Sequence, residues 1–303
     1  MSSHGGSVRV VLIALGANLG IAIAKFVGAV MSGSASLLAE AIHSVVDCSN
    51  QGLLLLGAKK SQRAPSELHP LGYGRETFFW SFIVSILLFS LGGMFAIYEG
   101  LHKISDREPL SSPILGLSIL IVSCVLEGFS FKACLEEVRK QNTFGSLWKW
   151  FRRTTSADLL VIFTEDAAAM VGLLIATLSL VVAWVTGDSR WDALGSILVG
   201  VLLVVVAVLL AYEIKSLLIG EAPATDFRTY LEQRLAVAVP GAEVLRLIVL
   251  QIGSHEVLLS CKLTPGQVTD VHTLIQGINQ VEREMKQKFP EIRWQFFEPD
   301  TEA

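Results

Sequence analysis

Residues 34–58 read SASLLAEAIHSVVDCSNQGLLLLGA, a stretch long enough to cross a bilayer yet interrupted by ionisable side chains. A charged group at the centre of a bilayer costs at least ~2.5–3.5 kcal/mol, so each of these side chains needs a compensating partner. On a helix, His43 and Asp47 lie on one face, with Asn50 about one turn further along. An imidazole nitrogen and a carboxylate oxygen supply half of a tetrahedral metal site. The competing interpretation is structural: His43 and Asp47 pair with each other or with a neighbouring helix.

A second group of acids lies in the apolar run 157–186, where Glu165 and Asp166 are adjacent and three alanines follow. A cation held between the two helices would compensate His43, Asp47 and Asp166 together. Glu165, about 100° around the helix from Asp166, is placed to reach the same cavity. The predicted ligands of this metal site are His43, Asp47, Asp166 and Glu165, and Asn50, Glu40 and His69 are less certain.

The last two of these weaker candidates also have plain structural interpretations. Glu40 lies one turn before His43, where it can support the site or form an ion pair. His69 lies beside Pro70 in the connection after this helix, where it can capture metal or simply order the loop.

The composition of the whole chain indicates a membrane protein. Of its 303 residues, 52% are hydrophobic and 17% are charged, and the mean hydropathy is +0.56, a balance that soluble domains rarely show. A net charge of -4 provides no basic surface for phosphates, so nucleic acid is not expected as a partner. Hydrocarbon about 30 Å thick requires roughly twenty apolar residues per helix. Six segments have this length: 8–30, 34–58, 78–104, 113–137, 157–186 and 191–218.

Basic residues are unevenly distributed over the connections between these segments. The second and fourth connections, with the adjoining helix ends, carry ten Lys and Arg residues, whereas the third and fifth carry three and the first carries none. Because basic residues stay on the cytoplasmic side, both termini are predicted to be cytoplasmic. The first apolar run shows no cleavage pattern and is predicted to remain as a span. A bacterial inner membrane is the expected location.

The character of the chain changes after Gly220, where Glu221-Ala222-Pro223 ends the last apolar run. The pattern that follows predicts a helix at 225–239, strands at 244–252 and 256–263, a helix at 269–289 and a strand at 292–297. This αββαβ order is typical of a small two-layer α/β sandwich. We therefore expect a six-helix transmembrane domain at 1–220 and a cytoplasmic domain at 221–303.

Four further motifs accompany the ionisable residues: GSASLLAEA at 33–41, HPLGYGRE at 69–76, WSF at 80–82 with LGG at 91–93, and WDALGS at 191–196. With the acids and histidine described above, they resemble the cation diffusion facilitator family, and within it the zinc transporter nine subgroup. The resemblance covers nearly the full chain. It implies a proton-coupled exporter that works as a homodimer, by alternating access about a metal site between the second and fifth spans. It also implies that the tail is a ferredoxin-like dimerisation domain.

Two departures from the family pattern limit these implications. Many members carry a histidine or aspartate four residues before the fifth-span aspartate, where this chain has Ile162. The fourth ligand is then Glu165, Asn50 or water, and an oxygen-richer site favours Mn²⁺, Fe²⁺ or Co²⁺ more than a His₂Asp₂ site does. In the tail, Phe296 stands where some relatives bind regulatory metal through a histidine. We expect a tail that dimerises without a full metal centre.

Together these features predict proton-coupled efflux of a divalent transition-metal ion, with Zn²⁺ first and Mn²⁺, Fe²⁺, Co²⁺ or Cd²⁺ as alternatives. Histidine and carboxylates bind metal only when deprotonated, so entering protons displace the ion. The alternative hypothesis is a non-transporting membrane metal sensor or scaffold that acts through its tail. No nucleophile, phosphate loop or metallohydrolase spacing accompanies the buried acids, so an enzyme is not expected. The expected partners are the metal ion, protons, the bilayer and a second copy of the chain, without a cofactor.

Overall fold

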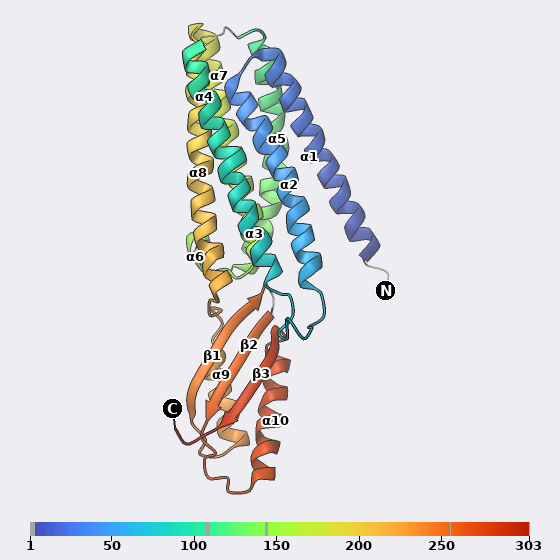
Figure 1. Cartoon of the computed structure of the whole chain (residues 1–303), viewed down its shortest axis with the longest axis vertical. Helices are drawn as coiled ribbons and strands as arrows, with labels where there is room; N and C mark the ends of the chain where they lie inside the picture. Colours follow the sequence, from blue (N-terminus) through green and yellow to red (C-terminus); the bar gives the residue numbers. More distant parts are fainter. Residues whose placement is uncertain (1–3, 107–109, 143–144, 255, 303) are drawn as a thin grey trace.

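The computed structural model describes residues 4–106, 110–142, 145–254 and 256–302, with side chains from residue 18 onward in the first helix. Figure 1 shows an elongated molecule made of a bundle of long helices and a small α/β tail that extends from one end of the bundle. The first helix begins at the end of the bundle that carries the tail, and the C-terminus lies on the tail.

The bundle is built from helices that run its full length. Five of them are α1 (His4–Ser32), α2 (Ala35–Ser61), α5 (Pro113–Gln141), α7 (Ala157–Thr186) and α8 (Arg190–Ile219). The remaining path combines α3 (Glu76–Leu87), a π-helical segment at Leu88–Met94 and α4 (Phe95–Asp106). A short helix, α6 (Leu147–Arg153), precedes α7, and its Trp150 is buried in the core near the tail end of the bundle.

Among the residues that the structure describes, four helical segments are long and apolar enough to cross a membrane: Glu76–Ser105, α5, α7 and α8. They coincide with four of the six predicted spans. The described part of α1 contributes a shorter apolar helix, Asn18–Ser32. In α2, polar residues such as Glu40 and Asp47 lower the hydropathy, although the helix packs against α1, α3, α7 and α8. Large apolar side chains on the outer surface, among them Phe129 and Leu178, are exposed, as lipid-facing residues are.

Close packing of the π-helical segment and α4 on α8 depends on small residues. A Cβ atom on Gly200 of α8 would lie 2.8 Å from the carbonyl oxygen of Gly93 and 2.8 Å from the amide nitrogen of Ile97. Since both neighbours are backbone atoms, neither can move aside cheaply. Glycine therefore allows the two backbones to touch, as is common between helices in membranes.

At the outer end of the bundle, opposite the tail, Asp192 at the start of α8 joins this helix to the start of α2. This carboxylate is 1% exposed and accepts hydrogen bonds from the Ser34 hydroxyl (2.7 Å), the Ala35 amide (2.5 Å) and the Ser36 hydroxyl. An acceptor at this position satisfies donors at the first turn of α2. The first turns of α2 and α8 are thereby held together.

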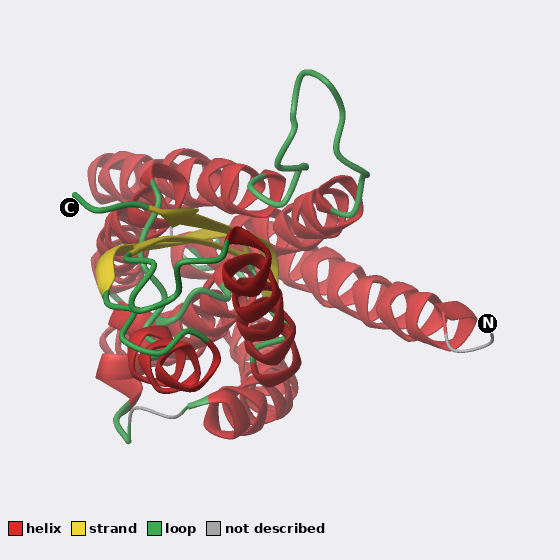
Figure 2. Cartoon of the chain, turned by 90° about the horizontal axis from the view of Figure 1, so that it is seen from below, coloured by secondary structure: helices red, strands yellow, loops and turns green. Residues whose placement is uncertain are grey.

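The tail contains the five elements in the predicted order: α9 (Phe227–Ala238), β1 (Val244–Gly253), β2 (Glu256–Leu263), α10 (Val271–Lys288) and β3 (Ile292–Pro299). The sheet order is β1-β2-β3, with β1 and β2 antiparallel and β2 and β3 parallel. Alternate residues of β2, including Val257 and Leu259, are buried against α9 and α10. Figure 2, viewed from the tail end, shows both helices on the same face of the sheet.

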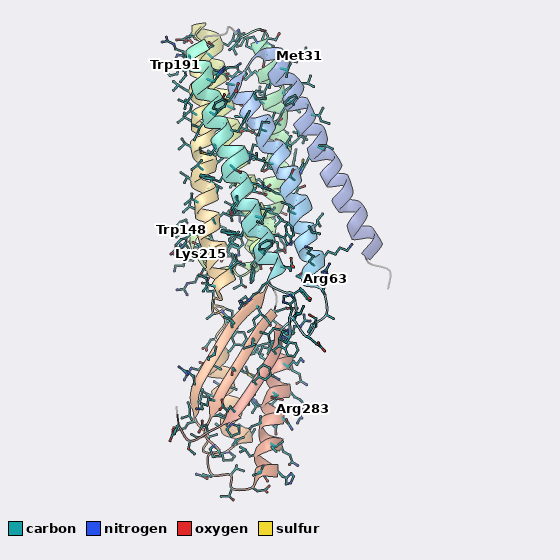
Figure 3. All side chains as sticks on the ribbon, in the orientation of Figure 1. Met31, Arg63, Trp148, Trp191, Lys215 and Arg283 are labelled. Carbon is teal, nitrogen blue, oxygen red and sulfur yellow. The ribbon has the colours of Figure 1, made fainter. Side chains whose placement is uncertain are left out.

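The tail contacts the bundle through the loop between α2 and α3. The Trp294 indole donates a hydrogen bond to the carbonyl oxygen of Leu71 (3.2 Å), and Gly74 approaches Gly253 closely enough to exclude any side chain. Figure 3 places Arg63 at this end of the bundle and Met31 and Trp191 at the opposite end. The loop that follows α2 therefore joins the two parts in addition to the chain connection after Gly220.

Candidate metal site in the helix bundle

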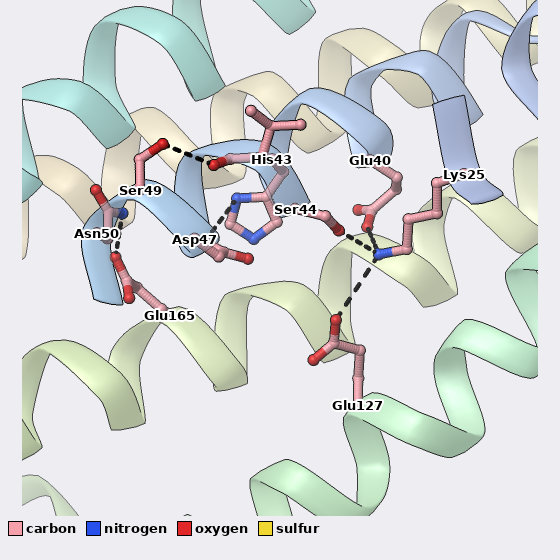
Figure 4. Close-up of polar contacts among 10 residues, drawn as sticks. Lys25, Glu40, His43, Ser44, Asp47, Ser49, Asn50, Glu127 and Glu165 are labelled. Atoms are coloured by element: carbon pink, nitrogen blue, oxygen red, sulfur yellow. Dashed lines mark hydrogen bonds and ion pairs between the residues drawn. The ribbon is translucent and has the colours of Figure 1, made fainter. Parts of the chain in front are cut away.

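His43 is enclosed at 0% exposure in the interior of the bundle. Its Nδ1 atom lies 3.5 Å from the Asp47 Oδ1 atom, one turn along the same helix, as predicted from their spacing (Figure 4). Neither imidazole nitrogen makes a hydrogen bond to any residue that the structure describes. Because buried polar groups normally have partners, an imidazole with two unsatisfied nitrogens fits a ligand better than a packing residue.

Asn50 and Glu165 form the second pair, and they connect α2 to α7. The Asn50 Nδ2 atom donates a hydrogen bond to Glu165 Oε1 at 2.5 Å, and the two residues are 0% and 5% exposed. The Asn50 Oδ1 atom is buried without a hydrogen-bond partner among the described residues. Glu165 thus faces α2, as predicted. Asn50, which donates to it, keeps its own Oδ1 atom available as a ligand.

Asp166 points in another direction from its neighbour. The Ser130 hydroxyl of α5 donates to Asp166 Oδ2 at 3.3 Å. Within the described parts of the chain, no three His, Cys, Asp or Glu side chains come together closely enough to hold a metal ion. The structure therefore brings His43 to Asp47 and Glu165 to Asn50, and leaves Asp166 apart. The four-residue ligand set stays a prediction.

Lys25 is a buried residue that the sequence analysis did not single out. It is 0% exposed, and its Nζ atom lies 2.7 Å from Ser44 Oγ, 3.4 Å from Glu40 Oε2 and 3.8 Å from Glu127 Oε1. An ionisable residue inside the apolar run 8–30 was the signal that could have identified it. Glu40 is accordingly engaged by a lysine in this structure, which matches the structural interpretation of that residue.

His69 lies on the exposed loop after α2 and does not approach His43. Its ring stacks edge-on against Tyr73 with centroids 4.6 Å apart, and it lines a cavity of about 610 Å³ with Arg75 and Trp80. At 1.5 Å per residue, the helix alone separates His43 from this loop by about 27 Å. Any contribution of His69 to metal handling is therefore made outside the bundle interior.

The ionisable side chains inside the bundle are predominantly acidic. Glu40 and Glu165 are buried there, the Asp47 and Glu127 side chains are each 18% exposed, and Lys25 is buried beside Glu40 and Glu127. Carboxylates in a medium of low dielectric constant strongly attract cations. An imidazole beside these carboxylates adds the nitrogen ligand that transition metals accept and alkali metals do not.

Comparison with known protein families matches residues 11–219 to the cation efflux transmembrane domain. The chain is 36% identical to Metal tolerance protein C4 of Arabidopsis thaliana over 222 residues, or 71% of this chain and 48% of that protein. It is 33% identical to Proton-coupled zinc antiporter SLC30A9, mitochondrial, of Mus musculus over 219 residues, or 72% of this chain and 39% of that protein. The chain thus spans about half or less of the length of these relatives. Magnetosome protein MamB of a Magnetospira strain is 30% identical over 164 residues, or 52% of this chain and 54% of that protein.

Proposed function

The chain belongs to the cation efflux family, the cation diffusion facilitators, and on that premise we propose that it exports a divalent transition-metal ion, first Zn²⁺, in exchange for protons. The observation that carries the proposal is His43, buried with two unsatisfied ring nitrogens and with Asp47 3.5 Å away. A polar group buried in this way costs free energy, which a bound cation offsets. The name of the mouse relative, a proton-coupled zinc antiporter, supports both the ion and the exchange.

The candidate ligands of α2 and α7 can exchange a metal ion for protons at the same atoms. His43 and Asp47 bind an ion only when they are deprotonated, so protons and metal compete for the same atoms. In the proposed cycle the ion binds from the cytoplasmic side, and Asp166 and Glu165 close around it as α7 moves relative to α2. Protons that enter from the opposite side then occupy the imidazole and a carboxylate and release the ion.

Four finer features complete the proposal. All six helical paths cross the membrane, because α1 and α2 pack alongside the four apolar segments and α2 carries His43 and Asp47. The tail, ferredoxin-like in its element order, pairs with that of a second copy. Both termini are cytoplasmic. A bacterial inner membrane remains the predicted location, although the animal relatives carry a mitochondrial name.

Reconstitution of the purified chain into vesicles with an acidic interior tests the transport proposal. Asp47→Ala should reduce Zn²⁺ uptake to the level of empty vesicles, because the ion loses a charged ligand. Glu137→Gln, which removes an exposed acid near the end of α5, is the matched control and should transport normally. Equal uptake by Asp47→Ala and the parent protein would refute the assignment.

The alternative, a sensor or scaffold that acts through the tail, is separated by the same assay. A chain that ends at Gly220 retains all of the predicted ligands, including His69, and the bundle around them. A transporter should keep measurable uptake in that form, whereas an activity that resides in the tail should disappear completely.

A further inference from the structure

The ammonium group of Lys25 occupies an enclosed position between three helices, α1, α2 and α5 (Figure 4). Two carboxylates from different helices, Glu40 and Glu127, converge on it, together with the Ser44 hydroxyl. Removing an ammonium ion from water costs several kcal/mol, and such a group persists in a membrane interior only with partners of opposite charge. The convergence of two acids on one lysine exceeds the single partner that a structural ion pair needs.

Not every oxygen atom of the side chains around Lys25 has a hydrogen-bond partner among the described residues. Glu40 is 0% exposed, and its Oε1 atom makes no hydrogen bond to any residue in the described part of the chain. This oxygen lies against Gly172 of α7, where even a Cβ atom would collide with it. Two carboxylates and a hydroxyl around a single positive charge also leave one negative charge in excess. This is a ligand set of the kind that a divalent cation takes from oxygen donors.

We propose that the ammonium of Lys25 fills a second cation site formed by Glu40, Glu127 and Ser44, and so excludes a divalent ion from it. A tethered ammonium cannot leave the protein, so it keeps these acids occupied and they take no part in carrying metal. The protomer is thereby restricted to the ion bound at His43 and Asp47. The inference rests on the proposed function only for the identity of that other site.

The geometry is compatible with replacement of the ammonium by a metal ion. The Nζ atom is 3.4 Å and 3.8 Å from the nearest carboxylate oxygens, whereas oxygen ligands lie about 2.0–2.6 Å from Mg²⁺ or Ca²⁺. The two carboxylates would need to approach the ion by roughly 1–1.5 Å. In Lys25→Gln, the shorter side chain gives this room and adds an amide oxygen as a further ligand.

Equilibrium dialysis of the full chain in detergent against Mn²⁺ and, separately, Zn²⁺ tests the proposal by counting ions per protomer. Lys25→Gln should bind one ion more than the parent protein, because the second site is vacated. Lys25→Arg keeps the cation and should bind the same number as the parent. The double variant Lys25→Gln with Glu127→Gln should lose the additional ion, and Lys132→Gln, an exposed lysine of α5, should change nothing.

Folding of the variants supplies an independent measurement. One buried and one partly buried acid without a cation destabilise the bundle, so Lys25→Gln should be recovered as a monodisperse protein in Zn²⁺ and in lower yield in a chelator. The proposal is overturned if Lys25→Gln binds no additional ion when folded, or if it fails to fold with metal as well as without it. A parent protein that binds no metal would refute the proposed function, while a gain of one ion in Lys25→Gln would still establish the second site.

Discussion

His43 is the residue on which the chemistry of the bundle depends most directly. It supplies the imidazole at a place where the other candidate ligands, Asp47, Asn50, Glu165 and Asp166, offer oxygen. Zn²⁺ accepts nitrogen, oxygen and sulfur ligands, whereas Mn²⁺ prefers oxygen. The preference of the site for Zn²⁺ over Mn²⁺ should therefore depend on the His43 side chain.

Replacement of that imidazole by a carboxylate should change metal preference. We expect His43→Asp to lower the ratio of Zn²⁺ to Mn²⁺ uptake by about tenfold, because the site becomes all-oxygen. Competitive uptake of the two ions into acid-loaded vesicles measures this ratio. His272→Asp, on the exposed first turn of α10, is the control and should leave the ratio unchanged. A ratio in His43→Asp equal to that of the parent would argue against His43 as a ligand.

Residue spacing predicted some neighbours in the site and could not predict others. The His43–Asp47 approach follows from two positions on one helix, and it is confirmed. The direction of Asp166, toward Ser130 of α5, depends on how α7 is rotated against its neighbours, which a single helix pattern does not contain. Lys25 was open to prediction from its charge, but its two acidic partners come from helices far apart in sequence.

At the scale of elements, the contact of α4 and the π-helical segment with α8 should be sensitive to a single methyl group. Gly200→Ala forces a Cβ atom against backbone atoms of Gly93 and Ile97, and overpacking of this kind costs about 1–3 kcal/mol. We expect an apparent melting temperature several degrees lower, measured by the fraction that stays monodisperse after heating in detergent. Gly52→Ala, with no atom within 4 Å of the added group, should melt like the parent. Equal stability of the two variants would contradict the close approach.

In the tail, an ion pair between Arg234 of α9 and Glu284 of α10 should make the contact of the two helices depend on pH. Hydrogen bonds from Arg234 and then Gln280 lower the pKa of Glu284 from 4.5 to about 2. The stabilisation is therefore complete above about pH 4.5 and is lost as the pH falls toward 2. Hydrogen exchange of α9 and α10 peptides in the full chain, corrected for the intrinsic rate, should rise over that range.

Glu284→Gln should remove the acid-dependent part of this exchange, because no carboxylate remains to be protonated. Glu232→Gln, which affects a pair within α9, is the control and should retain the dependence. Exchange in Glu284→Gln that still rises between pH 4.5 and 2 as in the parent would show that other groups control the contact.

The sequence pattern predicted some helices and strands accurately and missed others. The tail elements were predicted within about two residues because alternation and turn residues mark them. The long apolar helices were equally evident from length. The π-helical segment at Leu88–Met94 was not predicted, since one added residue in a helical turn leaves no trace in hydropathy. Helix α6 was not predicted as a helix, because its seven residues are too few to establish a period.

For the molecule as a whole, the composition of the chain indicates a helix bundle followed by an α/β tail. It does not indicate how the two parts contact each other. The tail reaches the bundle through Trp294 and the loop between α2 and α3, residues that carry no shared pattern in sequence. Since this loop follows α2 directly in the chain, we expect a displacement of the tail to be transmitted to the helix that bears His43. A second copy bound through the tail would act on the same connection.

The attachment of α2 to Asp192 determines which motion is open to that helix. With its first turn held against α8, we expect α2 to pivot about the outer end, as a lever roughly 39 Å long. A tilt of about 5° then displaces Ser61 by about 3 Å but His43 by only about 1 Å. The tail end of α2 therefore moves about three times as far as the imidazole, so that opening at that end and the geometry of the ligands are mechanically separated along one rigid rod.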